Sequence, residues 1–172
     1  MIFKVHVKLA KTALSELKDK NLKIGRKAFI FGNVFPDLIL PHMPAHRKNA
    51  SQHFFDKQHT KICGRRRKNA MKIHVWDSFL LGILSHYAAD YSCAAHRESY
   101  NENMRAHRRH EKAQLLFLKD HPHVLSETGG RGAGGNQRVS SLIGNGRTDS
   151  LSDELVGAMD AIRLTCAGLI TA

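Results

Sequence analysis

Cysteine is scarce in this chain of 172 residues, which contains only Cys63, Cys93 and Cys166. The number is odd and no two cysteines lie in a C-x-x-C spacing. Both features argue against a disulfide framework and against a zinc site made of thiolates. Unpaired cysteines are typical of proteins from a reducing compartment. The cysteine content therefore predicts a cytoplasmic protein.

Long apolar runs are also missing. No stretch approaches the roughly 18 consecutive apolar residues that a membrane-spanning helix needs. The N-terminal segment carries Lys4, Lys8 and Lys11 where a signal peptide would require an apolar core. We therefore expect neither a cleaved signal nor a transmembrane segment.

Acidic residues are few, with 15 Asp and Glu against 27 Lys and Arg, so the formal net charge is +12 with His neutral. This excess favours an anionic partner such as nucleic acid, a phospholipid surface or a soluble phosphodiester. Aromatic residues make up only 7% of the chain, which offers little material for stacking on nucleic-acid bases. The length suits a single domain with its own core, here residues 1–172.

Hydrophobic periodicity predicts an all-α fold. Apolar residues recur at helical spacing, or crowd into long stretches, in four segments: 5–18, 70–98, 104–119 and the C-terminal stretch that Ser150 or Ser152 can cap. Within the second segment, Gly82 is expected to mark the close approach of a neighbouring element. We expect a bundle of about five or six helices and no strands, enclosing the residues considered next.

Proline and glycine mark the expected interruptions. Pro36 predicts the end of an apolar segment and a turn that projects Asp37. Residues 38–68 contain further prolines and scattered histidines, so we expect a long loop there with one short helix near His53. Residues 129–149 are rich in Gly, Ser and Asn, a composition typical of a flexible loop before the last helix.

Metal-ligating side chains gather near the middle of the chain. His86 with Asp90, and His107 with Glu111, are spaced i and i+4, which puts an imidazole and a carboxylate on one helical face. His96 lies between the two pairs. Such pairs are often surface salt bridges, but apolar neighbours surround His86, and buried charges need a partner or a metal. Imidazole and carboxylate ligands suit zinc and similar divalent ions.

Taken in order, these residues resemble the zinc-dependent phospholipase C family, whose wider superfamily also contains the zinc-dependent single-strand nucleases. The core of the resemblance is one ordered set of ligand types: His86-x-x-x-Asp90-x-x-x-x-x-His96, followed by His107-x-x-x-Glu111. Upstream, Ser-Gln-His-Phe-Phe-Asp at 51–56 and Gly-Asn-Val-Phe-Pro-Asp at 32–37 resemble further family motifs. His6 fits the N-terminal histidine of the family.

The resemblance implies an α-helical phosphodiesterase with two or three zinc ions. It implies three side chains for each of two ions: His53, His86 and Asp90 for the first, and His96, His107 and Glu111 for the second. Asp90 would bridge to a third position shared with His6 and the terminal amine of Met1. Secreted family members begin with Trp after processing, whereas this chain begins with Met. Asp37 would act as general base or would orient the attacking water.

The expected reaction is hydrolysis of a phosphodiester by metal-activated water, because zinc lowers the pKa of bound water and stabilises charge on the reacting oxygens. Glu111 as the last ligand favours a phospholipase C-like enzyme, since the nucleases of the superfamily tend to use Asp there. The positive charge favours the alternative, a nuclease acting on single strands. A third interpretation is a non-catalytic metal-binding helical protein. For the phospholipase, peripheral contact with a membrane surface is also expected.

Overall fold

The computed structural model describes residues 3–19, 23–39, 48–68, 73–93, 104–126 and 150–170. These residues form seven helices: α1 (Phe3–Asp19), α2 (Arg26–Ile39), α3 (Lys48–Lys68), α4 (Val75–Tyr91), α5 (Met104–Asp120), the 3-10 helix η3 (Pro122–Ser126) and α7 (Leu151–Ile170). The described part of the chain contains no strand, which confirms the all-α prediction.

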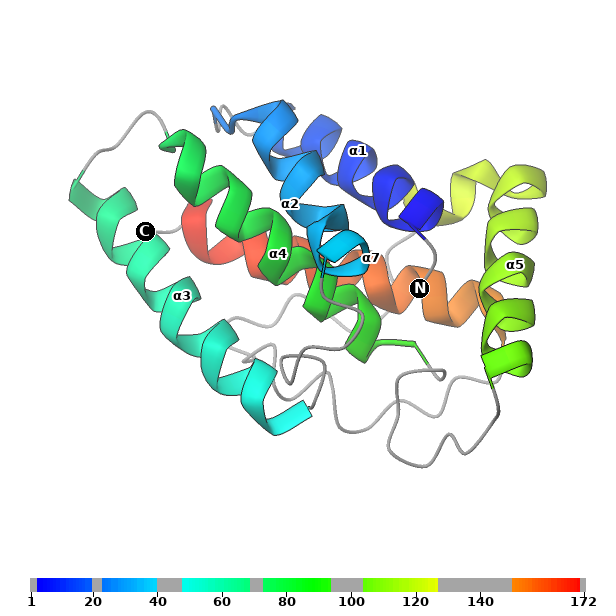
Figure 1. Cartoon of the computed structure of the whole chain (residues 1–172). Helices are drawn as coiled ribbons and strands as arrows, with labels where there is room; N and C mark the ends of the chain where they lie inside the picture. The colour runs from blue at the N-terminus through cyan, green and yellow to red at the C-terminus, as the bar shows by residue number, and fades with distance from the viewer. Residues whose placement is uncertain are drawn as a thin grey trace.

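Helices α4 and α7 run through the middle of the molecule, and Figure 1 shows α3 at one end and α5 at the other. Helix α4 packs on α2, α7, α3 and α1. The core lies between these helices, where Leu9 of α1, Leu84 of α4 and Ile162 of α7 are fully buried. Burial of such side chains provides the main driving force for assembling the bundle.

The amphipathic pattern correctly located α1, α5 and α7. Val5, Leu9 and Leu17 of α1 face the core as their spacing predicts. Ser150 caps α7, because its Oγ accepts a hydrogen bond from the backbone N–H of Asp153 at 3.1 Å. Helix α4 covers the centre of the helix predicted for residues 70–98.

The prediction that Pro36 ends its segment was wrong. Helix α2 continues through Pro36 to Ile39, so Asp37 lies in the last helical turn rather than in a turn beyond the helix. Two contacts with α4 hold this part of α2. The Asn33 side-chain amide donates to the carbonyl of Gly82 at 3.3 Å, and the Asn33 carbonyl contacts His86 Nδ1 at 2.9 Å. Tertiary packing thus offsets the hydrogen bond that proline removes.

The long loop expected over residues 38–68 was also wrong from Lys48 onward, where α3 forms a helix of 21 residues. Its core face is narrow: Phe55 and Ile62, seven positions apart, are buried, and most of the remaining described side chains are polar. His59 Nε2 contacts the Thr165 carbonyl of α7 at 2.9 Å. The predicted flexible loop, residues 129–149, lies outside the described residues.

Candidate metal centre

Helices α2 and α4 cross at two glycines, Gly32 and Gly82. A Cβ atom on Gly82 would overlap the carbonyl oxygen of Phe29, and one on Gly32 would overlap the carbonyl oxygen of Phe79. Only glycine fits at either position. The expectation that Gly82 marks a close approach is therefore confirmed, and the approach brings the end of α2, with Asp37, beside α4.

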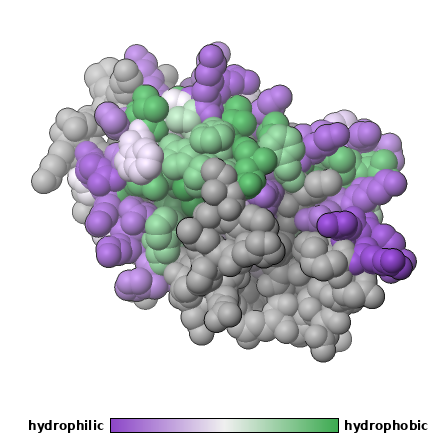
Figure 2. All heavy atoms as spheres, in the orientation of Figure 1, coloured by the Kyte–Doolittle hydropathy of each residue, from purple (hydrophilic) through white to green (hydrophobic). Residues whose placement is uncertain are grey.

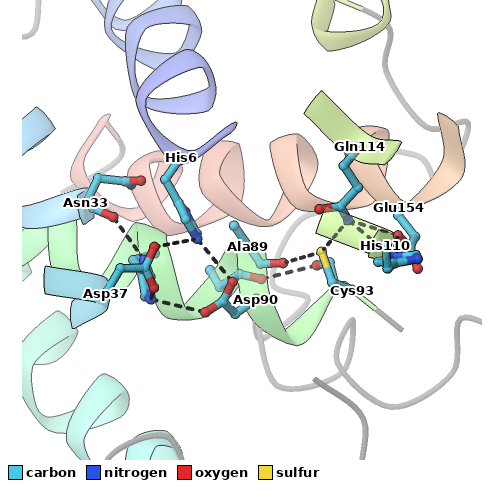
Figure 3. A network of polar contacts seen from close by, with 12 residues as sticks. His6, Asn33, Asp37, Ala89, Asp90, Cys93, His110, Gln114 and Glu154 are labelled. Atoms are coloured by element: carbon cyan, nitrogen blue, oxygen red, sulfur yellow. Dashed lines mark hydrogen bonds and ion pairs between the residues drawn. The ribbon is translucent and has the colours of Figure 1, made fainter. Parts of the chain in front are cut away.

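Four ionisable side chains from three helices converge there: His6 of α1, Asp37 of α2, and His86 and Asp90 of α4. His6 Nε2 lies 3.2 Å from Asp90 Oδ1, and His86 Nε2 lies 3.0 Å from Asp90 Oδ2. Asp37 lies farther out, with Oδ1 3.7 Å from His86 Nε2 and Oδ2 3.9 Å from His6 Nε2. Figure 3 shows His6, Asp37 and Asp90 directed toward one another. Ligand atoms of His6, His86 and Asp90 all lie within 4.8 Å of one another.

The two imidazoles are held in a defined orientation. Their rings stack with centroids 4.0 Å apart and planes inclined by 26°. His86 Nδ1 lies 2.9 Å from the Asn33 carbonyl, and a carbonyl only accepts, so Nδ1 carries the proton. Nε2 of His86 is therefore the nitrogen directed at the two carboxylates. Histidines that bind a metal usually donate one ring N–H to a carbonyl or carboxylate and direct the other nitrogen at the metal.

Burial dominates the electrostatics of the group. Burial lowers the pKa of His6 to about 3, helped by the charge of His86 and opposed by Asp90. Burial raises the pKa of Asp37 to about 6, where Asp90 adds to the rise and His86 opposes it. Burial also lowers the pKa of His86, but the Asp90 and Asp37 carboxylates together outweigh it and the net pKa is raised. At neutral pH His6 is therefore uncharged, with a nitrogen lone pair available to a metal ion.

The group has the properties of a cation site. His6 is fully buried, yet neither of its ring nitrogens makes a hydrogen bond within the described residues, and the same holds for Asp37 Oδ2. An unsatisfied buried polar atom costs about 1–3 kcal/mol. A divalent cation among these atoms would satisfy His6 and Asp37. The set of imidazole nitrogens and carboxylate oxygens fits zinc.

A family model described as zinc dependent phospholipase C matches residues 5–155, a range that contains His6, Asp37, His86 and Asp90. The chain belongs to the zinc-dependent phospholipase C family. This confirms the resemblance inferred from the motifs, and it agrees with zinc as the metal. No curated protein and no solved structure shows a significant match to the chain. Among the described helices, none is long and apolar enough to cross a bilayer.

Five further ligands are predicted from the resemblance to the family, and only some of them lie among the described residues. His53 lies in α3 with an exposed side chain and is not part of the buried group. Glu111 is half-buried in α5, and its charge makes a smaller contribution to the raised pKa of Asp37. For the remaining three, Met1 and His96 lie outside the described residues, and the side chain of His107 in α5 is not described. Their roles as ligands stay predictions.

A second polar network, whose residues were not predicted from the sequence, lies beside the candidate metal centre. Glu154 of α7 is buried, and its Oε2 lies 2.8 Å from His110 Nε2 and accepts a hydrogen bond from Gln114 Nε2 at 3.0 Å. Gln114 Nε2 also lies 3.5 Å from Cys93 Sγ, three residues after Asp90 (Figure 3). Burial raises the pKa of Cys93 to about 12, so the thiol stays protonated. The available signal was the i, i+4 spacing of His110 and Gln114.

Proposed function

We propose that this chain is a zinc-dependent phosphodiester hydrolase that acts on phospholipid headgroups in the manner of a phospholipase C. The observation that carries the proposal is the group of two stacked imidazoles and the buried Asp90 carboxylate, with the partly exposed Asp37 at its edge, in a member of the zinc-dependent phospholipase C family. The enzyme needs no side-chain nucleophile, because bound zinc supplies a water of lowered pKa and neutralises charge on the phosphate oxygens.

Each residue of the group takes one role in this proposal. Asp90 presents one oxygen to each imidazole, so it would bridge two metal positions, one with His86 and one with His6. His53 would complete the ligands on the His86 side, and Met1 would complete those on the His6 side. The predicted ligands of a further ion, which give two or three in all, are His96, His107 and Glu111.

Asp37 would act as the general base that accepts the proton of the attacking water. It is the outermost member of the group: its side chain is 25% exposed, whereas His6 and His86 are fully buried. Its two oxygens lie 3.7 Å and 3.9 Å from the imidazole nitrogens, farther than those of Asp90. A carboxylate between solvent and the metal ligands can accept a proton from water without giving up a strong metal bond.

Metal content and turnover test the proposal together. We expect two or three zinc equivalents by mass spectrometry in protein purified without a His-tag or chelating resin, and fewer in His86→Ala. Asp37→Asn should keep zinc but lose about 10²- to 10⁴-fold in hydrolysis of a short-chain phospholipid. Less than one equivalent in the parent, unchanged in His86→Ala after zinc is supplied, would contradict the proposal.

A nuclease is the second candidate, and the exposed arginines of α5 favour it. Arg105, Arg108 and Arg109 are exposed and lie close in sequence to Glu111, in a chain of net charge +12. Contacts of this kind with a phosphate backbone weaken steeply as salt rises. Hydrolysis of a single-stranded oligonucleotide that is lost on raising salt, together with no hydrolysis of phospholipid, would favour the nuclease. Zinc without turnover on either substrate would leave the non-catalytic metal-binding protein.

A further inference from the structure

Large apolar side chains are exposed on the outer face of α2 and α4. Within the described residues, the most exposed are Val75 at 59%, Trp76 at 58%, Leu38 at 56% and Phe31 at 50%. Figure 2 shows apolar side chains gathered over this part of the molecule. An apolar patch that a folded protein leaves in water commonly marks a surface of interaction.

The patch is built on a continuous set of rings. Phe79 of α4 is at the centre, with ring centroids 5.1 Å from Phe35, 5.7 Å from Phe31 and 5.2 Å from Trp76. Phe31 and Phe35 also meet edge to face at 5.6 Å. We call these four residues, with Leu38 and Val75, the aromatic ridge. Because the rings support one another, little side-chain entropy remains to be lost on binding.

The aromatic ridge lies close to the candidate metal centre along both helices. Leu38 follows Asp37, the group's outermost residue, whose side chain is 25% exposed. His86 lies seven residues, about two helical turns, beyond Phe79 on α4. A surface that contacts the aromatic ridge would therefore extend to the side of the molecule on which the metal centre reaches solvent.

Positive charge borders the aromatic ridge. Lys27 is exposed and lies four residues before Phe31, on the same face of α2. Lys23 and Arg26 nearby are also exposed. Asp77, in the first turn of α4, is paired with Arg65, whose Nε donates to Asp77 Oδ2 at 2.9 Å. An exposed Trp with basic neighbours is the combination that binds the interface of an anionic bilayer.

We propose that the aromatic ridge docks the protein on an anionic phospholipid surface, with Phe31, Trp76 and Leu38 entering the headgroup region. The choice of a lipid surface rests on the proposed function, because it brings the metal centre to headgroups. It also rests on charge. A second copy of the chain would carry the same +12 and the same lysine beside the ridge, whereas an anionic bilayer complements both.

Binding to vesicles tests the docking surface without any need for turnover. Trp76 is the only tryptophan in the chain, so its fluorescence reports on the ridge alone. With vesicles of phosphatidylcholine and phosphatidylserine, we expect a blue shift of the emission and co-sedimentation of the full chain. Vesicles of phosphatidylcholine alone should bind more weakly, and added salt should weaken binding to the anionic vesicles.

Two variants locate the surface. Phe31→Ser should weaken binding to anionic vesicles by about tenfold, because it removes a half-exposed ring that the bilayer would cover. Lys27→Glu should weaken it by at least about fivefold, with little effect on neutral vesicles. Leu116→Ser is the matched control, since Leu116 is 47% exposed on α5, away from the ridge. Circular dichroism verifies that all three fold.

The outcomes separate this inference from the proposed function. Vesicle binding that Phe31→Ser weakens, without hydrolysis of any phospholipid, would support the docking surface and contradict the enzyme. Hydrolysis of a water-soluble short-chain phospholipid without vesicle binding would overturn the docking surface alone. Equal loss in Leu116→Ser would overturn it as well. So would a dimer in light scattering that Phe31→Ser converts to monomer, because a second copy would then cover the ridge.

Discussion

Asp90 is the residue on which the candidate metal centre depends most. Its oxygens lie 3.2 Å from His6 Nε2 and 3.0 Å from His86 Nε2, one to each ring. A carboxylate that divides its oxygens in this way can serve two cations at once. His86, by contrast, offers a single nitrogen to the group, because its Nδ1 is held by the Asn33 carbonyl.

This asymmetry predicts unequal losses of metal. Asp90→Ala should lower the zinc content by more than one equivalent, while His6→Ala should lower it by about one, because only Asp90 would contact both positions. Elemental analysis of the purified variants measures the difference. His123→Ala is the control, since His123 is exposed in η3 and should leave the metal content unchanged. Equal losses in the Asp90 and His6 variants would contradict a bridging carboxylate.

The candidate site could be predicted only in part, for reasons that differ between residues. His86 and Asp90 share one helix, so their spacing was sufficient to pair them. His6 lies 80 positions before His86 in the chain, and only the resemblance to a family connected the two. Asn33 lies in the motif at 32–37 but was given no role, because it holds His86 through its backbone carbonyl and nothing in a sequence marks which carbonyl accepts a hydrogen bond from a histidine.

At the scale of the helices, the crossing of α2 and α4 determines where Asp37 lies. Gly82→Ala should lower the free energy of unfolding by about 1–3 kcal/mol, because the new methyl group would meet the rigid carbonyl of Phe29. Hydrolysis of a short-chain phospholipid should fall with it, since separating the helices moves Asp37, the proposed base, away from His86. Thermal denaturation and a turnover assay measure both effects.

Gly64→Ala is a matched control for this change. Gly64 lies in α3, and a Cβ there would meet nothing within 4 Å. Alanine favours helix over glycine by up to about 1 kcal/mol, so this variant should be as stable as the parent or more stable. An unchanged melting temperature in Gly82→Ala would show that the helices can separate at little cost.

Arg163 joins three elements. Its guanidinium donates to both oxygens of Glu16 in α1 at 2.8 Å and 3.0 Å, to Asp160 at 2.8 Å and to the Leu125 carbonyl of η3 at 2.8 Å. Arg163→Ala should lower the free energy of unfolding in urea by about 1–3 kcal/mol, because these acceptors lose a charged donor. Arg163→Lys should recover only part of this free energy of unfolding, since lysine cannot make the paired contact with Glu16.

The exposed Arg108 of α5 is the control for Arg163. Arg108→Ala should change the free energy of unfolding by no more than about 0.5 kcal/mol. If Arg163→Ala were equally mild, the contacts of Arg163 would contribute nothing net to the association of α1, η3 and α7.

The helices that could be predicted are those with a wide apolar face. Leu155, Met159, Ile162 and Cys166 give α7 a continuous buried stripe, and α1 has a similar one. Helix α3 was not predicted over its full length because few of its described residues are buried. Phe55 and Ile62 are among these few, and they lie between polar and basic side chains. Helix α2 was cut short at Pro36 because local propensity favours an end there, whereas the packing on α4 that carries the helix onward joins residues far apart in sequence.

At the scale of the whole molecule, the metal centre and the fold depend on each other. The group draws one histidine from α1, one carboxylate from α2 and two residues from α4. These helices pack against one another directly, and α4 is also the main partner of α7. A ligand that binds the group therefore stabilises the packing of three helices and, through α4, that of a fourth.

Removal of metal should consequently destabilise the entire protein. Without a cation, the nitrogens of His6 stay buried without a hydrogen bond within the described residues. A ligand at about 1,000 times its dissociation constant stabilises the native state by about 4 kcal/mol. For a chain of this size, that corresponds to about 8–16 °C in melting temperature.

We expect a chelator to lower the melting temperature by about this amount, zinc to restore it, and magnesium, which prefers oxygen ligands, to leave it low. The Asp90→Ala variant should respond little to the chelator, because its site is already impaired. A melting temperature that stays constant while the zinc content falls to zero would show that the buried group folds without a metal.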